Sequence, residues 1–285
     1  GISEQNAINL AAGLSAAGKK VYVYFMAAWA ARCFEQIRYS CALANNPITI
    51  LGNGVGLGYA PAGPAHYSTE DMAYMRSICG MEVCSPSNSS FVESYVDITC
   101  QEPSLRYMRL ERTSPSEALK VKYELEDFKN GFKVLKQCFV YDSSTSICII
   151  SSGYMLDRAC EVSRELNDKS TAVVDVFRSK PIDNDALKDF CKNYDFIITL
   201  EEQTIFGGFG SAICEALSDA GINKPILRLG LPEKFIFENA SRDYLLDTNG
   251  LSVQNIVKNI KEFISWKQLK ILDTLERLMV WLKLN

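Results

Sequence analysis

The chain has 285 residues, 47% of them hydrophobic and 22% charged, which suits one large or two ordinary domains and excludes general disorder. Thirty Lys and Arg against 34 Asp and Glu give a net charge of -4, without the basic excess typical of a nucleic-acid binder. No apolar run reaches the roughly 18–20 residues of a membrane helix, and the first ten residues lack a signal-peptide pattern. We therefore expect a soluble, cytoplasmic protein with neither nucleic-acid nor membrane partners.

Cysteine and histidine usage limits the possible metal chemistry. Ten cysteines are scattered through apolar segments without a CxxC pair, and the closest two, Cys79 and Cys84, have no second cluster to complete a zinc site. His66 is the single histidine of the chain, which excludes a His-rich metal site. We expect buried free thiols in a reducing compartment and no metal ligand from this chain.

Short β-rich runs alternate with helical stretches, which predicts α/β architecture: two three-layer α/β/α domains with mostly parallel sheets. In the first domain we expect strands at 21–25, 47–51, 81–84 and 105–110, and helices at 6–17, 28–44, 68–78 and 88–99. In the second we expect strands at 146–151, 172–176, 196–200 and 226–228, and helices at 156–166, 184–191 and 209–220. Polar residues at 68–71 and 87–90 supply N-cap oxygens for two of these helices.

Changes in composition suggest the domain boundaries. The first domain covers 1–115, a charged linker covers 116–140, the second domain covers 141–250 and a helical extension covers 251–285. Apolar residues recur at helical spacing between Trp266 and Leu284, which predicts a packing or interface helix. Because the first domain opens on a helix rather than a strand, we expect it to lack its N-terminal segment.

A carboxylate lies at the loop-to-helix junction that opens the chain. Glu4 follows Gly1-Ile2-Ser3 and comes just before an apolar helix, where it can face a ligand at a sheet edge. Taken alone, it is better explained as a first-turn residue favoured by the helix dipole.

Several motifs in order then resemble one family. Arg32–Arg38, Gly56–Asp71 and Arg106–Leu110 are similar to the pyrimidine-binding domain of the transketolase family of thiamine diphosphate enzymes. The later segments resemble the C-terminal domain of that family: Ile149–Met155, Lys180–Asp183, Leu200–Gln203 and Gly207–Ser211. The resemblance extends from residue 1 to about residue 230.

The resemblance implies that Glu4 hydrogen-bonds a ring nitrogen of the cofactor's aminopyrimidine, which promotes formation of the thiazolium ylide. A carboxyl buried against a heterocycle can share a proton with that nitrogen, whereas an exposed one would do so poorly. The cofactor then cleaves a ketose and delivers a two-carbon fragment to an aldehyde. Phe25 or Trp29 is expected to stack on the pyrimidine, with core packing the alternative for Phe25, and Arg32 is assigned to the cofactor site.

The substrate side of the site departs from the family pattern. His66, in Gly63-Pro64-Ala65-His66, is similar to the family histidine that faces the reacting oxygens. Ala62 stands where an acid usually contacts a sugar hydroxyl, and a second, phosphate-gripping histidine is missing from Gly52–Gly58. Arg112 or Arg109 matches the arginine aimed at an acceptor phosphate, with a solvated surface arginine as the alternative.

The chain contains no Gly-Asp-Gly run, from which the family builds its site for diphosphate and Mg²⁺. We therefore expect a partner, an N-terminal transketolase subunit that holds the diphosphate and most of the Mg²⁺ contacts, in an α2β2 assembly with small sugar substrates. Glu201 and Glu202 could suggest an acid/base dyad, but we interpret both as structural, with a close backbone approach at Gly207-Gly208.

Three functions remain open. The first is the C-terminal subunit of a split transketolase. The second is the β subunit of a 2-oxo acid dehydrogenase E1 component, and the third is a non-catalytic scaffold with the same fold. The loop at 63–66 and Glu35–Arg38 favour the transketolase, and the retained Glu4 and His66 argue against the scaffold.

Overall fold

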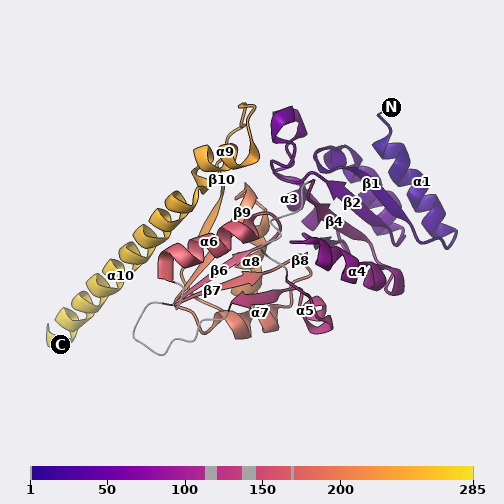
Figure 1. Ribbon diagram of the computed structural model, residues 1–285. Helices are drawn as coiled ribbons and strands as arrows, with labels where there is room; N and C mark the ends of the chain where they lie inside the picture. The colour runs from indigo at the N-terminus through magenta and orange to yellow at the C-terminus, as the bar shows by residue number, and fades with distance from the viewer. Residues whose placement is uncertain (1, 113–120, 137–145, 168–169, 285) are drawn as a thin grey trace.

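The computed structural model describes residues 2–112, 121–136, 146–167 and 170–284, with side chains up to residue 269, and it contains two sheets side by side (Figure 1). The first has the order β1 (Tyr22–Met26), β2 (Thr49–Asn53), β4 (Arg106–Leu110), β3 (Glu82–Cys84), β8 (Arg178–Lys180). The second has the order β10 (Ile226–Leu231), β9 (Phe196–Thr204), β6 (Ile147–Ser151), β7 (Thr171–Asp175), β5 (Lys133–Lys136). Among these strands only two pairings are antiparallel, that of β8 with β3 and that of β5 with β7. The expectation of mostly parallel sheets is therefore confirmed.

The helices follow the expected alternation. Around the first sheet they are α1 (Glu4–Ala16), η1 (Ala27–Cys33), α2 (Phe34–Gln36), η2 (Ile37–Leu43), η3 (Ala60–Ala62), η4 (Pro64–His66), α3 (Asp71–Arg76), α4 (Ser89–Gln101) and α5 (Leu125–Asn130). Around the second they are α6 (Met155–Asn167), α7 (Asn184–Cys191), α8 (Phe209–Asp219), α9 (Arg242–Leu246), η5 (Asp247–Leu251) and α10 (Val253–Leu284). The expected helix at 28–44 is divided into 3-10, α and π turns.

The N-caps expected from the sequence have different outcomes. Asn88 caps α4, because its side chain accepts a hydrogen bond from the Phe91 amide at 2.9 Å. The cap expected at 68–71 is wrong: α3 begins at Asp71 behind Glu70, which makes no side-chain cap.

Strand alternation explains the three layers. On β6, Ile147 and Ile149 join the core beneath α6, α9 and α10, whereas Cys148 and Ile150 join the core beneath α7 and α8. Because successive side chains of a strand point to opposite faces, an entirely apolar strand must be covered on both sides. The expected three-layer architecture is therefore confirmed.

Two segments differ from the domain boundaries expected from the sequence. β8 comes from the expected second domain, yet it pairs with β3 in the first sheet, where Lys180 lies opposite Val83. Within the expected linker at 116–140, the described residues form α5 and β5 rather than a plain connection. The reason is aromatic burial: the rings of Tyr123 and Phe128 each pack edge-to-face with Phe91 of α4, at centroid distances of 5.1 and 5.2 Å.

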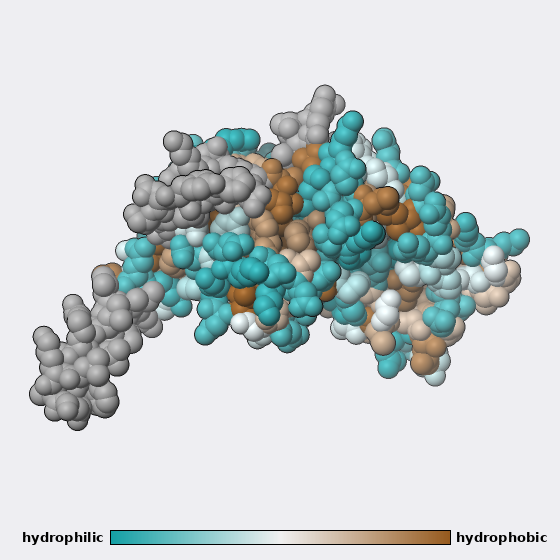
Figure 2. Space-filling view, turned by 90° about the horizontal axis from the view of Figure 1, so that it is seen from below, coloured by the Kyte–Doolittle hydropathy of each residue, from teal (hydrophilic) through white to brown (hydrophobic). Residues whose placement is uncertain are grey.

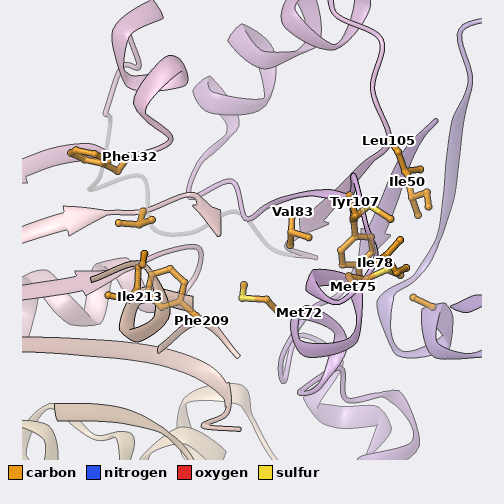
Figure 3. Close-up of a cluster of buried hydrophobic side chains, with 14 of the residues drawn as sticks. Ile50, Met72, Met75, Ile78, Val83, Leu105, Tyr107, Phe132, Phe209 and Ile213 are labelled. Atoms are coloured by element: carbon orange, nitrogen blue, oxygen red, sulfur yellow. The ribbon is translucent and has the colours of Figure 1, made fainter. Parts of the chain in front are cut away.

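The two units, each a sheet with its helices, share one hydrophobic core. Met72 of α3 lies between Phe209 of α8 and the first sheet's Tyr107 (Figure 3). Residues from both sheets belong to this cluster of buried side chains. A core that crosses the boundary keeps the units in a fixed arrangement, because packed interiors resist shear.

The cysteines are only partly as expected. None of the nine cysteines within the described residues forms a disulfide, five are buried and Cys79 is exposed, while Cys138 lies outside the described residues. α10 includes the expected helix at 266–284 and projects away from the second sheet (Figure 1), but most of its expected apolar stripe lies outside the described side chains.

The face in Figure 2 carries separated hydrophobic patches among hydrophilic residues. No helix within the described residues is both long and apolar enough to cross a membrane.

A buried carboxyl joins both units. Asp175, at the end of β7, accepts hydrogen bonds from the Tyr123 hydroxyl at 2.6 Å and the Ser87 hydroxyl at 2.9 Å. Its side chain is fully buried, and burial raises the pKa of Asp175 from 3.8 to about 7, against the effect of the two hydroxyl hydrogen bonds. The protonated form is thus favoured by the fold.

This shift predicts a pH-dependent stability. Because the folded pKa of Asp175 lies above the unfolded one, the native state binds more protons between about pH 4 and pH 7, and the free energy of unfolding falls as pH rises through that window. Asp175→Asn removes this titration, so its urea-unfolding free energy should change less than that of the wild type between about pH 5 and pH 8. Asp189→Asn, at an exposed carboxylate whose pKa is lowered, should retain the wild-type slope. Parallel profiles for wild type and Asp175→Asn would contradict the assignment.

Candidate active site

The carboxyl ends of β1, β2 and β4 meet at one edge of the first sheet. η1 follows β1, a glycine-rich loop follows β2, and Glu111 and Arg112 follow β4. Since α1 leads into β1, the start of α1 returns to the same edge. Ligands of parallel α/β sheets bind outside this edge.

Glu4 is shielded but retains a free oxygen. Its Oε2 accepts a hydrogen bond from Arg32 Nη1 at 3.2 Å, and the Glu4 side chain is 11% exposed against 43% for Arg32. The side-chain Nε2 of the adjacent Gln5 donates a hydrogen bond to the Arg32 carbonyl at 3.0 Å, which holds the start of α1 against η1. Burial, followed by the nearby Glu4 charge, raises the pKa of the Cys33 thiol to about 11. The carboxylate therefore sits beside a neutral thiol, with one exposed arginine as its ion-pair partner.

His66 lies near two aromatic rings. Its ring centroid is 6.2 Å from that of Trp29 on η1 and 6.3 Å from that of Tyr59. Nδ1 of His66 is shielded from solvent and has no hydrogen-bond partner among the described residues. A buried polar nitrogen without a partner costs free energy, which a ligand at this position would recover.

Tyr59 is a site residue that the sequence analysis missed. Its hydroxyl accepts a hydrogen bond from Asn53 Nδ2 at 2.9 Å, and Arg112 lies 4.9 Å above its ring. Gly54, with φ of 73°, makes room for the ring, since a Cβ there would clash with the Tyr59 ring carbons. The sequence feature that could have pointed to Tyr59 is Gly54, but a glycine by itself indicates only a turn.

Two of the expected site residues are instead structural. Phe25 is 7% exposed and packs in the shared core, so of the two expected stacking aromatics only Trp29 lies at the edge. Arg109 is buried, and its guanidinium contacts both Asp71 oxygens at 2.8 and 3.1 Å and the Ser85 hydroxyl at 3.1 Å. The structure therefore gives Arg109 buried protein partners in place of the open position expected of a substrate-binding arginine. Arg112 is exposed and remains available.

The two arginines should differ sharply in their contribution to stability. Arg109→Met leaves the Asp71 carboxylate buried without its ion pair, which should lower the free energy of unfolding by about 3–5 kcal/mol. Arg112→Met removes only an exposed cation–π contact and should cost about 1 kcal/mol or less. Urea unfolding followed by circular dichroism measures both, and equal losses would refute the distinction.

The acidic pair in the second unit has structural partners. Glu201 accepts hydrogen bonds from the amides of Phe209 and Gly210 at 2.6 and 2.9 Å at the start of α8, and burial raises its pKa to about 7. A Cβ on Gly208 would clash with the Glu201 carboxylate, as the close approach expected there requires. Glu202 pairs with Arg242. Among the described residues, no group of three or more His, Cys, Asp or Glu side chains could hold a metal ion.

Comparison with known proteins adds independent information. The family model "Transketolase, pyrimidine binding domain" matches residues 1–115, and "Transketolase, C-terminal domain" matches residues 139–256. The chain is 30% identical to one subunit of the apulose-4-phosphate transketolase of Phocaeicola vulgatus, over 93% of this chain and 82% of that protein. It is also 30% identical to 1-deoxy-D-xylulose-5-phosphate synthase of Cupriavidus necator, over 95% of this chain but only 42% of that protein.

Solved structures agree with this. A split-gene transketolase, described as an inactive beta4 tetramer, is 28% identical with a TM-score of 0.76, over 92% of this chain and 81% of that one. The transketolase of Leishmania mexicana is 14% identical with a TM-score of 0.75, over 92% of this chain and 37% of that one, which shows a common fold.

Proposed function

Because this chain belongs to the transketolase family, we propose that it is the C-terminal subunit of a two-chain, thiamine diphosphate-dependent transketolase. The reaction is transfer of a two-carbon ketol unit from a ketose donor to an aldehyde acceptor. The observation that carries the proposal is the shielded carboxylate of Glu4 at the same sheet edge as Trp29 and His66.

The residues at the edge fit the pyrimidine half of the cofactor. Glu4 Oε1 has no hydrogen-bond partner among the described residues, so it can hold a proton shared with a ring nitrogen. Trp29 is half-buried and offers an aromatic surface. When bound, thiamine diphosphate supplies the nucleophilic carbon that cleaves the ketose. Arg32 holds the other carboxylate oxygen, Oε2, and so orients the carboxylate while Oε1 stays available.

His66 and Arg112 are assigned to the substrate. Nδ1 of His66 is shielded from solvent and unpartnered among the described residues, so it can exchange a proton with a reacting oxygen. Arg112, stacked on Tyr59, can pair with an anionic group of the acceptor. Ala62 cannot make the polar contact that an acid would give a sugar hydroxyl, so the sugar specificity differs from that of ordinary ketose-cleaving members.

A separate chain is proposed to supply the diphosphate and Mg²⁺ site, in an α2β2 assembly. The relative in Phocaeicola vulgatus is named as one subunit of its enzyme, and this chain spans only 42% of the synthase of Cupriavidus necator. The similar split-gene structure is described as an inactive tetramer of beta chains. Both descriptions support a subunit that needs a partner for activity.

The test reconstitutes this chain with a co-purifying chain that contains the Gly-Asp-Gly motif, and assays ketol transfer from phosphorylated and unphosphorylated ketoses. Glu4→Gln should lower kcat by about 100-fold or more, because general acid–base help is lost, with unchanged thermal stability. Glu35→Gln, at an exposed glutamate on α2, is the matched control and should retain full turnover.

Each alternative has its own outcome in that assay. Unchanged turnover in Glu4→Gln would support the scaffold, and decarboxylation of a 2-oxo acid without ketose cleavage would support an E1 β subunit. Formation of 1-deoxy-D-xylulose 5-phosphate would support a synthase, a second candidate favoured by the 30% identity to such enzymes.

A further inference from the structure

The loop that carries Tyr59 and His66, residues 54–68, is closed at its neck. The Gly56 amide donates to the Ser68 carbonyl at 2.9 Å, and the Ser68 amide donates back to Gly56 at 2.8 Å. We call this segment the His66 loop. It leaves β2 of the first sheet, and it also contacts the second unit.

Glu202 of β9 touches the neck directly. Its Oε1 accepts a hydrogen bond from the Leu57 amide at 3.1 Å, a contact buried between the two units. Gly56 has φ of 58°, and a Cβ on it would lie 2.6 Å from Glu202 Oε2. The neck is therefore shaped to receive this carboxylate.

Arg242 of α9 locks the carboxylate in place. Its Nε lies 2.8 and 3.0 Å from the two Glu202 oxygens, and its Nη1 donates to Glu111 Oε2 at 2.7 Å. Its Nη2 lies 3.5 Å from the Val55 carbonyl, and the guanidinium stacks 3.6 Å above the Tyr154 ring. The three charged side chains are between 6 and 9% exposed. We call this set the Arg242 clasp.

Tyr67, next to the neck at the C-terminal end of the loop, is tied to the same unit. The Tyr67 hydroxyl donates toward the Glu238 carbonyl at 2.9 Å and lies 3.1 Å from the Ala60 carbonyl. Leu57, Ala60 and Tyr67 belong to the hydrophobic cluster formed mainly by β6, β9, α6, α9 and α10. Beside the tip, Pro64 and Ala65 border a cavity of about 460 Å³, so packing alone does not fix that side.

We propose that Glu202 and Arg242 are positioning residues, which hold the His66 loop from the second unit and so set the place of His66 against Trp29. The effect on catalysis rests on the proposed function, whereas the effect on loop geometry does not. The C-terminal unit thus contributes to the active site without touching substrate.

The geometric test uses Trp29 fluorescence. In the full chain with Trp266→Phe and Trp281→Phe, Trp29 is the one remaining tryptophan, and His66→Ala should change its emission because the imidazole lies against the indole. Arg242→Lys keeps the charge but loses the bidentate contact with Glu202. In that background, the difference in Trp29 emission caused by His66→Ala should be smaller by about twofold or more. Arg228→Lys is the matched control and should preserve the full change, since within the described residues Arg228 donates hydrogen bonds to Ile205 and Ser211 of its own unit.

The kinetic test uses the complex reconstituted with the diphosphate-binding partner. Arg242→Lys should lower kcat by about tenfold, yet cause no further loss in a His66→Ala background, because both changes act through the same side chain. Tyr67→Phe removes the hydrogen bond to the Glu238 carbonyl without altering buried charge. It should lower kcat by less than Arg242→Lys does, and it too should cause no further loss in the His66→Ala background. This second variant tests the proposal even where Arg242→Lys folds poorly.

The outcomes separate the two proposals. A His66-dependent emission change that persists in Arg242→Lys and Tyr67→Phe, or kinetic losses that simply add, would overturn the positioning role. Loss of that emission change together with absent ketol transfer in the wild-type complex would uphold the positioning role and reject the proposed function.

Discussion

One guanidinium, that of Arg242, holds carboxylates from both units of the molecule. Glu202 comes from the second sheet and Glu111 from the end of β4 in the first. Burial alone would raise the pKa of the Glu202 carboxyl, and the arginine counteracts this while its own pKa is raised. Desolvating three charges consumes most of their mutual attraction, so the cluster adds little net stability. Its contribution is to specify one arrangement, because any displacement would leave a buried charge unpaired.

The same principle operates elsewhere between the units. Gln203 of β9 donates to Asp71 at 2.9 Å, which connects the second sheet to the buried pair of Asp71 and Arg109. Asp175 connects β7 to the hydroxyl of Ser87 in the first unit. Met72 and Phe209 belong to the buried apolar cluster that both units share. The apolar contact supplies the driving force for docking, and the hydrogen bonds define its geometry.

This arrangement explains how irregular segments can carry a precise site. Trp29 lies on a 3-10 helix and His66 on a single 3-10 turn, and neither element is stable alone. Their positions are set by what packs behind them, namely the shared core for η1 and the second unit for the His66 loop. Such a loop can vary at its tip, as at Ala62, while its neck stays fixed.

The sequence alone determined the α/β class and most strands and helices, because apolar periodicity is a local property. Its resemblance to the transketolase family pointed to Glu4, Trp29 and His66 as candidate site residues. Only the tertiary structure separated Arg109 from Arg112 and Phe25 from Trp29, since burial depends on neighbours distant in the chain. It also placed β8 in the first sheet and brought Glu202, with its partner Arg242, into contact with the His66 loop. Residues 145 or more positions apart, such as Leu57 and Glu202, leave no local signal of their contact, so their pairing is decided by folding alone.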